Sequence, residues 1–463
     1  METPVPVLTT LSNWSANVGL ADIPEAVQQV AVRCLIDTLG VALAGSASDV
    51  AAKVRRVANQ SGAAGECSVL GQAQRLSAPA AAFANAVAAH ALDFDDNAYP
   101  GFVHGSVVIL PAALAVAQMR GLSGSQWLTA FVVGAECEYA LARMLTRHLY
   151  DQGWWTTGVL GSVGACAAAC HALGLNAEQT TNAMGIVVSG TGGMKAGFGS
   201  DAKVLMAGRA SESGVVAALL AQAGSTGPAG IVEHPRGLAA MFNAGVLDEG
   251  VLQGLGCDWS LLDPGVDIKR IAVCLSAHAA VDALRELLQD PAISPDTIER
   301  IVCDAPPIVV ENLIYPLPVT RQQAQFSLQF ALALTWREGD VALEHVSQEM
   351  TQRCDILICM PRISLISSAR WADPALRQSA PEGAWVKLWL KDGSTRERFC
   401  AMPIGTASNP LSRGQLRAKF LKCSTQVLAL PAAQSLLADL EQVQHLANVR
   451  ALWPEVHSQE VHA

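Results

Sequence analysis

Residues whose types and spacing could do chemistry gather in four short segments of an otherwise apolar chain. The first segment, residues 90–97 with the sequence HALDFDDN, places His90 and three carboxylates at the end of an Ala-rich helix. Negative charge at a helix C-terminus opposes the helix dipole, so these carboxylates reduce the local stability of the helix end. Such a local conflict is typical of a functional site. A solvated surface loop explains the same residues equally well.

The second segment centres on His104, which stands with Gly105 and Ser106 directly before an apolar helix. The N-terminus of that helix favours anions and the neutral form of an imidazole, which can act as a base. The alternative is an ordinary histidine of a surface loop. We favour the base, because general acid–base chemistry uses a histidine in such a setting.

Two further segments add cations. Lys203 follows two glycines in residues 197–203, GFGSDAK, where glycine permits close approach of a ligand and an ammonium group can hold a carboxylate. Lys269, with Cys274 and His278, lies where the sequence pattern changes from helical to α+β. Clefts form at such domain junctions. Together the four segments predict a site for a small anionic molecule, built from Lys, Arg and His.

Composition and spacing exclude several other classes of function. The 463-residue chain has a net charge of −10 and no basic run, which argues against nucleic acid as a partner. The Gly-rich residues 190–197 lack the ending of a phosphate-binding loop, and residues 223–227 lack the first glycine of a nucleophile elbow. The 12 cysteines include no C-x-x-C pair, so we expect small buried hydrophobes and no metal site.

Hydropathy and the first residues give an expectation for the compartment. The chain is 51% hydrophobic and 16% charged, as in compact globular proteins. Its apolar stretches are interrupted by charge, Gly or Pro before they reach the ~20 residues of a membrane span. The first residues, METP, lack the basic region of a secretory signal. We therefore expect no membrane partner and a cytoplasmic location.

The elements that must position these segments are mostly helices. Apolar residues recur at helical spacing through most of the first 265 residues, between Gly, Pro and capping signals. Helices are predicted over residues 23–43, 78–92, 106–119, 125–148, 158–173, 177–188 and 203–223. Their short connections favour antiparallel neighbours, so the fold class is mainly α.

After residue 265 the pattern becomes α+β. The predicted elements of this part are strands over 298–303, 356–366, 385–390 and 395–401, and helices over 276–289 and 321–336. From Leu411 the chain is helical again and ends in a helix over 431–449. We therefore predict a large all-helical domain formed by both chain ends, residues 1–265 and 406–463, with an inserted smaller α+β domain over residues 266–405.

In this order, the four segments resemble the MmgE/PrpD family, which includes 2-methylcitrate dehydratase, cis-aconitate decarboxylase and iminodisuccinate epimerase. The likeness is strongest in residues 89–96, AHALDFDD, where the family has A-H-x-x-D-x-D-D. His104 matches the histidine of the family's H-P-x-x-x-x-x-P-A, although Gly105 replaces the usual proline. Lys203 matches the lysine of T-K-x-x-H-x-G, and residues 269–278 match K-x-x-x-x-C-x-x-x-H.

The resemblance implies a helical domain, an α+β lid domain and a homodimer. It also implies a lyase that acts on a small di- or tricarboxylate without a metal or an organic cofactor. Within that class we rank dehydration like that of 2-methylcitrate dehydratase first, and decarboxylation or epimerisation second. In each reaction negative charge builds up beside a carboxylate, and cationic side chains aimed at that charge lower the barrier.

Roles follow for the matched residues. We expect His104 to transfer the proton, with Asp93 orienting it or assisting it. Lys203 and Lys269 would hold substrate carboxylates. Residues that would line the cleft as substrate-binding or proton-relay groups are Asn97, Trp155, Cys274 and His278.

Three positions depart from the family pattern. The family's G-W-H-P-T is here GWWTT, so Trp155 stands in place of an active-site histidine, Met206 replaces another histidine, and Asn97 replaces a threonine. Losing two imidazoles removes proton donors and anion contacts, and Trp155 suggests a bulkier or more apolar substrate. Two alternatives stay open. One is a non-catalytic binding protein on the same scaffold; the other is a metal-dependent lyase with the ligands Asp93, Asp95, Asp96 and His104.

Overall fold

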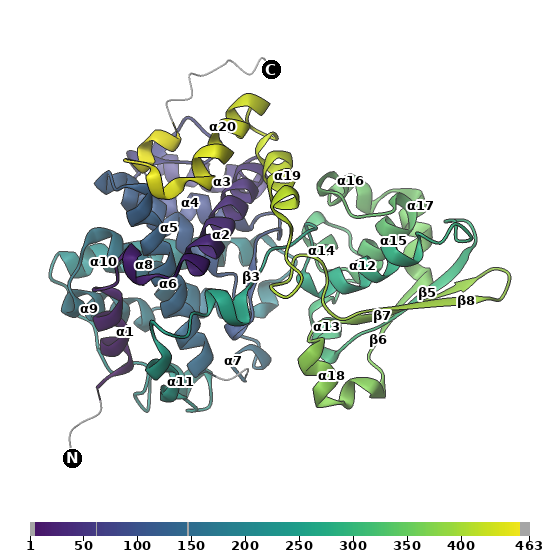
Figure 1. Cartoon of the computed structure of the whole chain (residues 1–463), viewed down its shortest axis with the longest axis horizontal. Coiled ribbons are helices and arrows are strands. Elements are labelled where there is room, and N and C mark those ends of the chain that lie inside the picture. Colours follow the sequence, from purple (N-terminus) through teal and green to yellow (C-terminus); the bar gives the residue numbers. More distant parts are fainter. Residues whose placement is uncertain (1–4, 62, 146–147, 454–463) are drawn as a thin grey trace. The chain divides into compact units, whose positions relative to one another are not determined.

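The computed structural model describes residues 5–61, 63–145 and 148–453, and the chain divides into two compact units (Figure 1). The helical unit comprises Met1–Ala196, Ala202–Asp267 and Ser412–Ala463. The mixed unit comprises Gly197–Asp201 and Ile268–Leu411. Helices dominate the described residues and the sheets are few and small, which confirms the mainly α class.

The helical unit contains every helix that apolar spacing predicted for it, with ends that differ by a few residues. The helix predicted over 125–148 includes residues 146–147, which lie outside the described residues. In the structure, α6 ends at Met144. The helices of this unit are α1 Val7–Ser15, α2 Glu25–Gly45, α3 Asp49–Gln60, α4 Ala78–His90, α5 Gly105–Arg120, α6 Gly124–Met144, α7 His148–Asp151, α8 Thr156–Leu173, α9 Ala177–Ser189, α10 Asp201–Gln222, α11 Leu238–Phe242, α19 Arg413–Ser424 and α20 Leu430–Glu441.

Small residues allow the core helices of this unit to approach closely. Helix α8 packs against both α5 and α6, and almost all of its residues are buried. A Cβ added at Gly134 of α6 would lie 2.6 Å from the carbonyl oxygen of Gly164 of α8, so a larger residue would push the two helices apart. This packing fixes α5 and α4, which carry the polar segments at their ends.

Two short antiparallel ladders, which we did not predict, complete the helical unit. Strand β1 Ala64–Ser68 pairs with β2 Arg75–Leu76. Strand β3 Asn97–Ala98 pairs with β4 Val266–Asp267, so that Asn97 lies opposite Asp267. The second ladder ties the end of the acidic segment to a strand far along the chain.

The mixed unit is built on a four-stranded sheet with the strand order β6-β5-β7-β8. Strand β5 is parallel to β6 and antiparallel to β7, and β7 and β8 form the predicted hairpin. Helices α12 and α15 pack against this sheet. The elements of this unit are β5 Ile298–Asp304, β6 Ile363–Ile366, β7 Ala384–Leu390, β8 Thr395–Cys400, α12 His278–Leu287, α13 Pro307–Asn312, α14 Arg321–Ala324, α15 Leu328–Glu338, α16 Gln348–Thr351, α17 Cys354–Cys359 and α18 Pro374–Ser379.

The strand predicted over 356–366 is wrong in its first half. Residues Cys354–Cys359 form helix α17, in which Ile356 and Cys359 are buried whereas Leu357 and Ile358 are exposed. Burial three residues apart is the spacing of a helix face, and only Ile363–Ile366 form a strand. Residues 356–360, ILICM, are all hydrophobic, so the order of polar and apolar residues shows no helical period there.

Of two further predicted helices, one is interrupted and the other ends earlier than expected. The helix expected over 321–336 is two helices, because the Ser327 hydroxyl accepts a hydrogen bond from the Phe330 amide and begins α15 anew. The last long helix, α20, ends at Glu441, and short 3-10 turns follow it.

Three helices correct the expectation that no apolar stretch is long enough to cross a membrane. By length and composition, α2, α8 and α10 are long and apolar enough. Their apolar windows are 67%, 94% and 56% buried inside the protein, respectively. Helices α2 and α8 pack against other helices of the helical unit, and in α10 a Cβ added at Gly214 would lie 2.5 Å from the backbone nitrogen of Cys166 in α8.

Candidate active site

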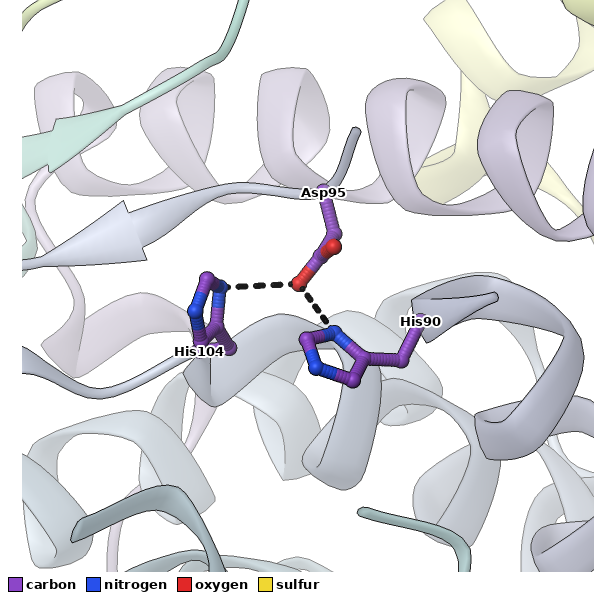
Figure 2. A group of neighbouring side chains, drawn as sticks. All are labelled: His90, Asp95 and His104. Atoms are coloured by element: carbon purple, nitrogen blue, oxygen red, sulfur yellow. Dashed lines mark hydrogen bonds and ion pairs between the residues drawn. The ribbon is translucent and has the colours of Figure 1, made fainter. Parts of the chain in front are cut away.

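Two histidines of the helical unit converge on one buried carboxylate (Figure 2). Asp95 Oδ2 lies 3.0 Å from His90 Nδ1 and 2.9 Å from His104 Nδ1. His90 is the last residue of α4 and His104 directly precedes α5, so the ends of two packed helices bring the rings together. An ionised carboxylate only accepts hydrogen bonds, and both Nδ1 atoms therefore donate to it.

The contacts of His104 fix its tautomer. In addition to Asp95, its Nδ1 lies 2.8 Å from the carbonyl oxygen of Asp96, a second group that can only accept. The proton therefore sits on Nδ1, and the neutral ring keeps the lone pair of Nε2 for other chemistry. The His104 side chain is 11% exposed, whereas those of His90 and Asp95 are fully buried.

Burial and charge set the protonation of this group. Burial acts to raise the pKa of Asp95, but the attraction of His90 and His104 and their hydrogen bonds outweigh it and hold that pKa well below its ordinary value. Burial lowers the pKa of His90 to about 4, against the pull of Asp95. An ionised Asp95 beside a neutral His90 can therefore stabilise positive charge on His104 when that ring takes up a proton.

Two more of the predicted residues form an ion pair. Lys203 Nζ, in the first turn of α10, lies 2.5 Å from Asp93 Oδ1, and both side chains are about 95% buried, with 5% and 4% exposed. Asp93 has a φ of 49°, a left-handed conformation that few residues other than glycine adopt. An ammonium group has three donors, so Lys203 can contact other acceptors in addition to Asp93.

Asp95, and not Asp93, is thus the carboxylate that orients His104. The sequence suggests Asp95 only as a metal ligand and suggests no role for His90. The signal was present in residues 89–96, since the same short motif contains the histidine and all three aspartates.

The alternative of a solvated loop for these aspartates is wrong. Asp93, Asp95 and Asp96 are 3%, 0% and 0% exposed. Asp96 accepts a hydrogen bond from the Ser106 hydroxyl, yet burial raises its pKa to about 7, helped by the nearby charges of Asp37 and Asp95. Of these two adjacent aspartates, Asp95 is therefore ionised and Asp96 is about half protonated at pH 7.

Trp155 is buried behind the histidines. It is 1% exposed, and its ring stacks on His90 with the ring centres 5.3 Å apart. Lys203 Nζ lies 5.6 Å from the Trp155 ring centre. The tryptophan that replaces a family histidine thus packs against two residues of the group, while Asn97 is held in the β3–β4 ladder and is 6% exposed.

The remaining predicted residues, Lys269, Cys274 and His278, belong to the mixed unit. Lys269 is 1% exposed, and His278 Nε2 lies 3.2 Å from the carbonyl oxygen of Val273. Cys274 is half-buried, and its amide donates to the carbonyl of Gln325. Their meeting with His104 and Lys203 stays a prediction.

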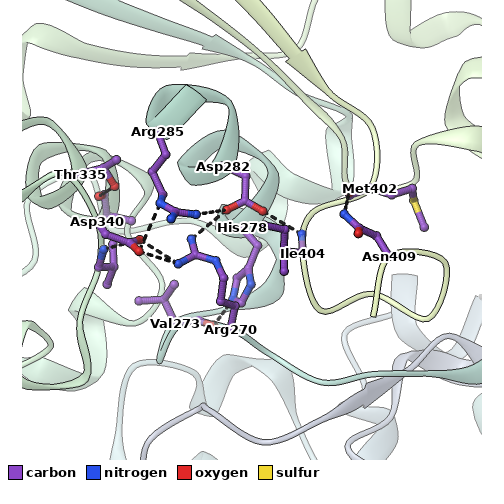
Figure 3. Close-up of polar contacts among 12 residues, drawn as sticks. Arg270, Val273, His278, Asp282, Arg285, Thr335, Asp340, Met402, Ile404 and Asn409 are labelled. Carbon is purple, nitrogen blue, oxygen red and sulfur yellow. Dashed lines mark hydrogen bonds and ion pairs between the residues drawn. The ribbon is translucent and has the colours of Figure 1, made fainter. Parts of the chain in front are cut away.

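Beside Lys269, a cluster of permanent charges fixes the backbone of the mixed unit (Figure 3). Arg270 forms ion pairs of 2.8 Å with Asp282 and 2.7 Å with Asp340. Asp282 also accepts from the amide of Ile404 and from Arg285. One carboxylate therefore holds the segment after Lys269 to the segment that leaves the sheet.

Among the described residues, one group could hold a metal ion. Ligand atoms of its members, His90, Asp95 and His104, lie within 4.8 Å of one another. The contact between His104 Nδ1 and the carbonyl oxygen of Asp96 does not fit a metal on that nitrogen, because an oxygen with lone pairs needs a hydrogen there. The donor set therefore fits a hydrogen-bonded group better than a metal centre.

Comparison with known proteins identifies the family of this chain. The model of the MmgE/PrpD N-terminal domain matches residues 9–248, and that of the MmgE/PrpD C-terminal domain matches residues 271–444. The cis-aconitate decarboxylase of Mus musculus is 28% identical over 433 residues, covering 91% of this chain and 87% of that protein. The Homo sapiens cis-aconitate decarboxylase is 27% identical, covering 93% and 90%, and the cis-aconitate decarboxylase-like protein oryM of Aspergillus oryzae is 26% identical, covering 96% and 93%. With both domain models matched in order along the sequence, the chain belongs to the MmgE/PrpD family.

Proposed function

We propose that this protein is a lyase that acts on a small polycarboxylate without a cofactor, and that decarboxylation of an acid of the cis-aconitate type is its first candidate reaction. One observation carries the proposal: Asp95 and the Asp96 carbonyl hold the proton of His104 on Nδ1, which leaves Nε2 for proton transfer. The names of the relatives favour decarboxylation over the dehydration that we ranked first from the sequence.

The reaction asks for one proton and for stabilised negative charge. In a β,γ-unsaturated acid, the electron pair of the bond to the departing carboxylate forms a new double bond. The old double bond shifts, and its far carbon takes a proton while CO₂ leaves. Charge therefore builds up on a carbon beside a second carboxylate, where a proton donor and a cation lower the barrier.

The residues of the helical unit divide this work. His104 in its protonated form donates the proton from Nε2, and Asp95 stabilises the positive ring before the transfer. Lys203, fixed by its ion pair with Asp93, places a positive charge that holds a substrate carboxylate. Lys269 of the mixed unit would hold a second carboxylate, and Asn97, Cys274 and His278 would supply further contacts.

In dehydration and epimerisation, His104 would first act as a base instead of an acid. A neutral His104 would remove a proton beside a carboxylate, and the products would differ only in what leaves afterwards. Trp155 and Met206, in place of two family histidines, take away proton donors and favour a substrate that needs fewer of them.

An NMR assay in heavy water separates these reactions. The protein is incubated with cis-aconitate, with hydroxy tricarboxylates and with imino dicarboxylates, before and after treatment with a chelator. Decarboxylation gives CO₂ and one deuterium in the product, dehydration gives an alkene without loss of carbon, and epimerisation exchanges the proton beside a carboxylate. The proposal predicts the first outcome, unchanged by the chelator. Binding without turnover or exchange would indicate a non-catalytic homologue, and loss of activity with the chelator would indicate a metal enzyme.

A further inference from the structure

A lysine from the end of the chain reaches the centre of the acidic segment. Lys419 lies on α19, is 8% exposed, and donates through Nζ to the carbonyl oxygen of Phe94 at 2.8 Å. The same Nζ lies 2.6 Å from Asp37 Oδ1 on α2 and 3.9 Å from the centre of the Phe94 ring. These residues all belong to the helical unit, although Phe94 and Lys419 are 325 positions apart.

Phe94 stands between the two carboxylates that the proposed chemistry needs. On one side Asp93 pairs with Lys203 from a left-handed backbone conformation, and on the other side Asp95 receives both histidines. Backbone in that conformation persists only when its surroundings hold it. The Phe94 carbonyl lies between them in the sequence and accepts a hydrogen bond from the buried ammonium group of Lys419.

We propose that Lys419 is a positioning residue for the reaction: by holding the Phe94 carbonyl it keeps Asp93 against Lys203 and Asp95 against His104. The inference rests on the proposed function and extends it to a residue outside the four segments. A charge-assisted hydrogen bond to a buried carbonyl is stronger than a neutral one and gives the turn a single position. Helix α19, near the end of the chain, thus supplies a buried cation that residues 93–95 do not contain.

The competing explanation is that Lys419 only neutralises Asp37. Burial raises the pKa of Asp37 to about 6, and Lys419 acts against that rise. Removing the lysine would then harm the protein only because a buried carboxylate loses its cation. The two explanations differ in which contact matters, the carboxylate of Asp37 or the carbonyl of Phe94.

Three variants separate the two contacts. In K419M both contacts are lost, in D37N only the ion pair is lost, and in D37N/K419M neither buried charge remains. We expect K419M to lower both Tm and kcat. We expect the double variant to recover most of the Tm but to keep a kcat at least tenfold below wild type, with KM changed less than threefold. D37N should keep kcat within threefold, as should K422M, which changes an exposed lysine of the same helix.

Hydrogen–deuterium exchange of the peptide that contains residues 90–97 gives a readout that needs no substrate. We expect its amides to exchange at least tenfold faster in K419M and in D37N/K419M, and at the wild-type rate in D37N and K422M. Recovery of both turnover and slow exchange in the double variant would overturn the proposal. If the wild-type protein turned over none of the acids, the proposed function would fail, while the exchange rates would still decide whether Lys419 holds the segment.

Discussion

The two units of this protein use buried charge in different ways. In the helical unit, Asp95 is fully buried and its partners are His90 and His104, groups that can gain or lose a proton. In the mixed unit, Asp282 is 6% exposed and its partners are Arg270 and Arg285, which stay charged. A carboxylate that faces imidazoles can change the protonation of its partners, whereas one that faces guanidinium groups can only hold them in place. The first arrangement is suited to catalysis and the second to anchoring the backbone.

Among substitutions at the ion pairs of the two units, the largest expected effect is that of K203M. The substitution removes the cation that pairs with Asp93 and that would hold a substrate carboxylate, so kcat/KM should fall roughly 10³-fold. Steady-state kinetics with the substrate found in heavy water measure the effect, and K53M, which changes an exposed lysine of α3, is the control. Activity within tenfold of wild type would remove Lys203 from the site.

A loss of nearly the same size is expected for D95N. An asparagine cannot accept from both Nδ1 atoms with a full negative charge, so the ring of His104 loses the partner that fixes its tautomer. We expect kcat to fall roughly 10²–10³-fold, with KM changed little. An unchanged kcat would mean that Asp95 only fills space beneath the histidines.

For D282N, by contrast, the effect should fall on stability. The variant loses charge against Arg270 and Arg285, so the free energy of unfolding should fall by about 2 kcal/mol while kcat stays within tenfold. Chemical denaturation measures it against D296N, because Asp296 is 91% exposed and its ion pair should contribute little. A kcat loss as large as that of D95N would erase the difference between the two units.

The effect most specific in its pH dependence is that of E138Q. Burial raises the pKa of Glu138 to about 8, and neither of its oxygens has a hydrogen-bond partner among the described residues. Between pH 5 and 8 the folded protein keeps a proton that the unfolded chain has released, so folding stability falls as the pH rises through this window. E138Q has no such proton.

The stability of E138Q relative to wild type should therefore rise with pH, by on the order of 2–4 kcal/mol between pH 5 and 8. Urea unfolding at several pH values measures the difference, and E233Q, which changes an exposed carboxylate of the same unit, should show no such trend. A difference that stays constant with pH would mean that Glu138 is ionised in the folded protein.

Local signals predicted most of the helical elements. Asn176 caps α9 by accepting from the Gln179 amide, as its spacing from Gln179 indicates, and the helix follows. The strand prediction over 356–366 fails at residues 356–360 because this run, ILICM, has no polar residue to show a period. Tertiary packing, and not the local sequence, determines the secondary structure of these residues.

The candidate site could be predicted only where its residues lie close together in the sequence. Residues 90–104 carry His90, Asp95 and His104 within one stretch, so the sequence could mark the region, although it did not show which carboxylate meets which ring. Lys419 is 325 positions from Phe94, and no local pattern distinguishes it from another helix lysine. Such contacts are made by the fold as a whole.

The proposed reaction depends most on His104 as the group that moves the proton, and one measurement tests this role directly. Wild type and H104Q are compared by NMR in heavy water with cis-aconitate, following the release of CO₂ and the deuterium in the product. We predict that wild type places one deuterium beside a carboxylate and that H104Q, with its Tm and substrate affinity retained, is slower by roughly 10²–10⁴-fold. Near-native turnover by H104Q, with the same deuterium in the product, would contradict it.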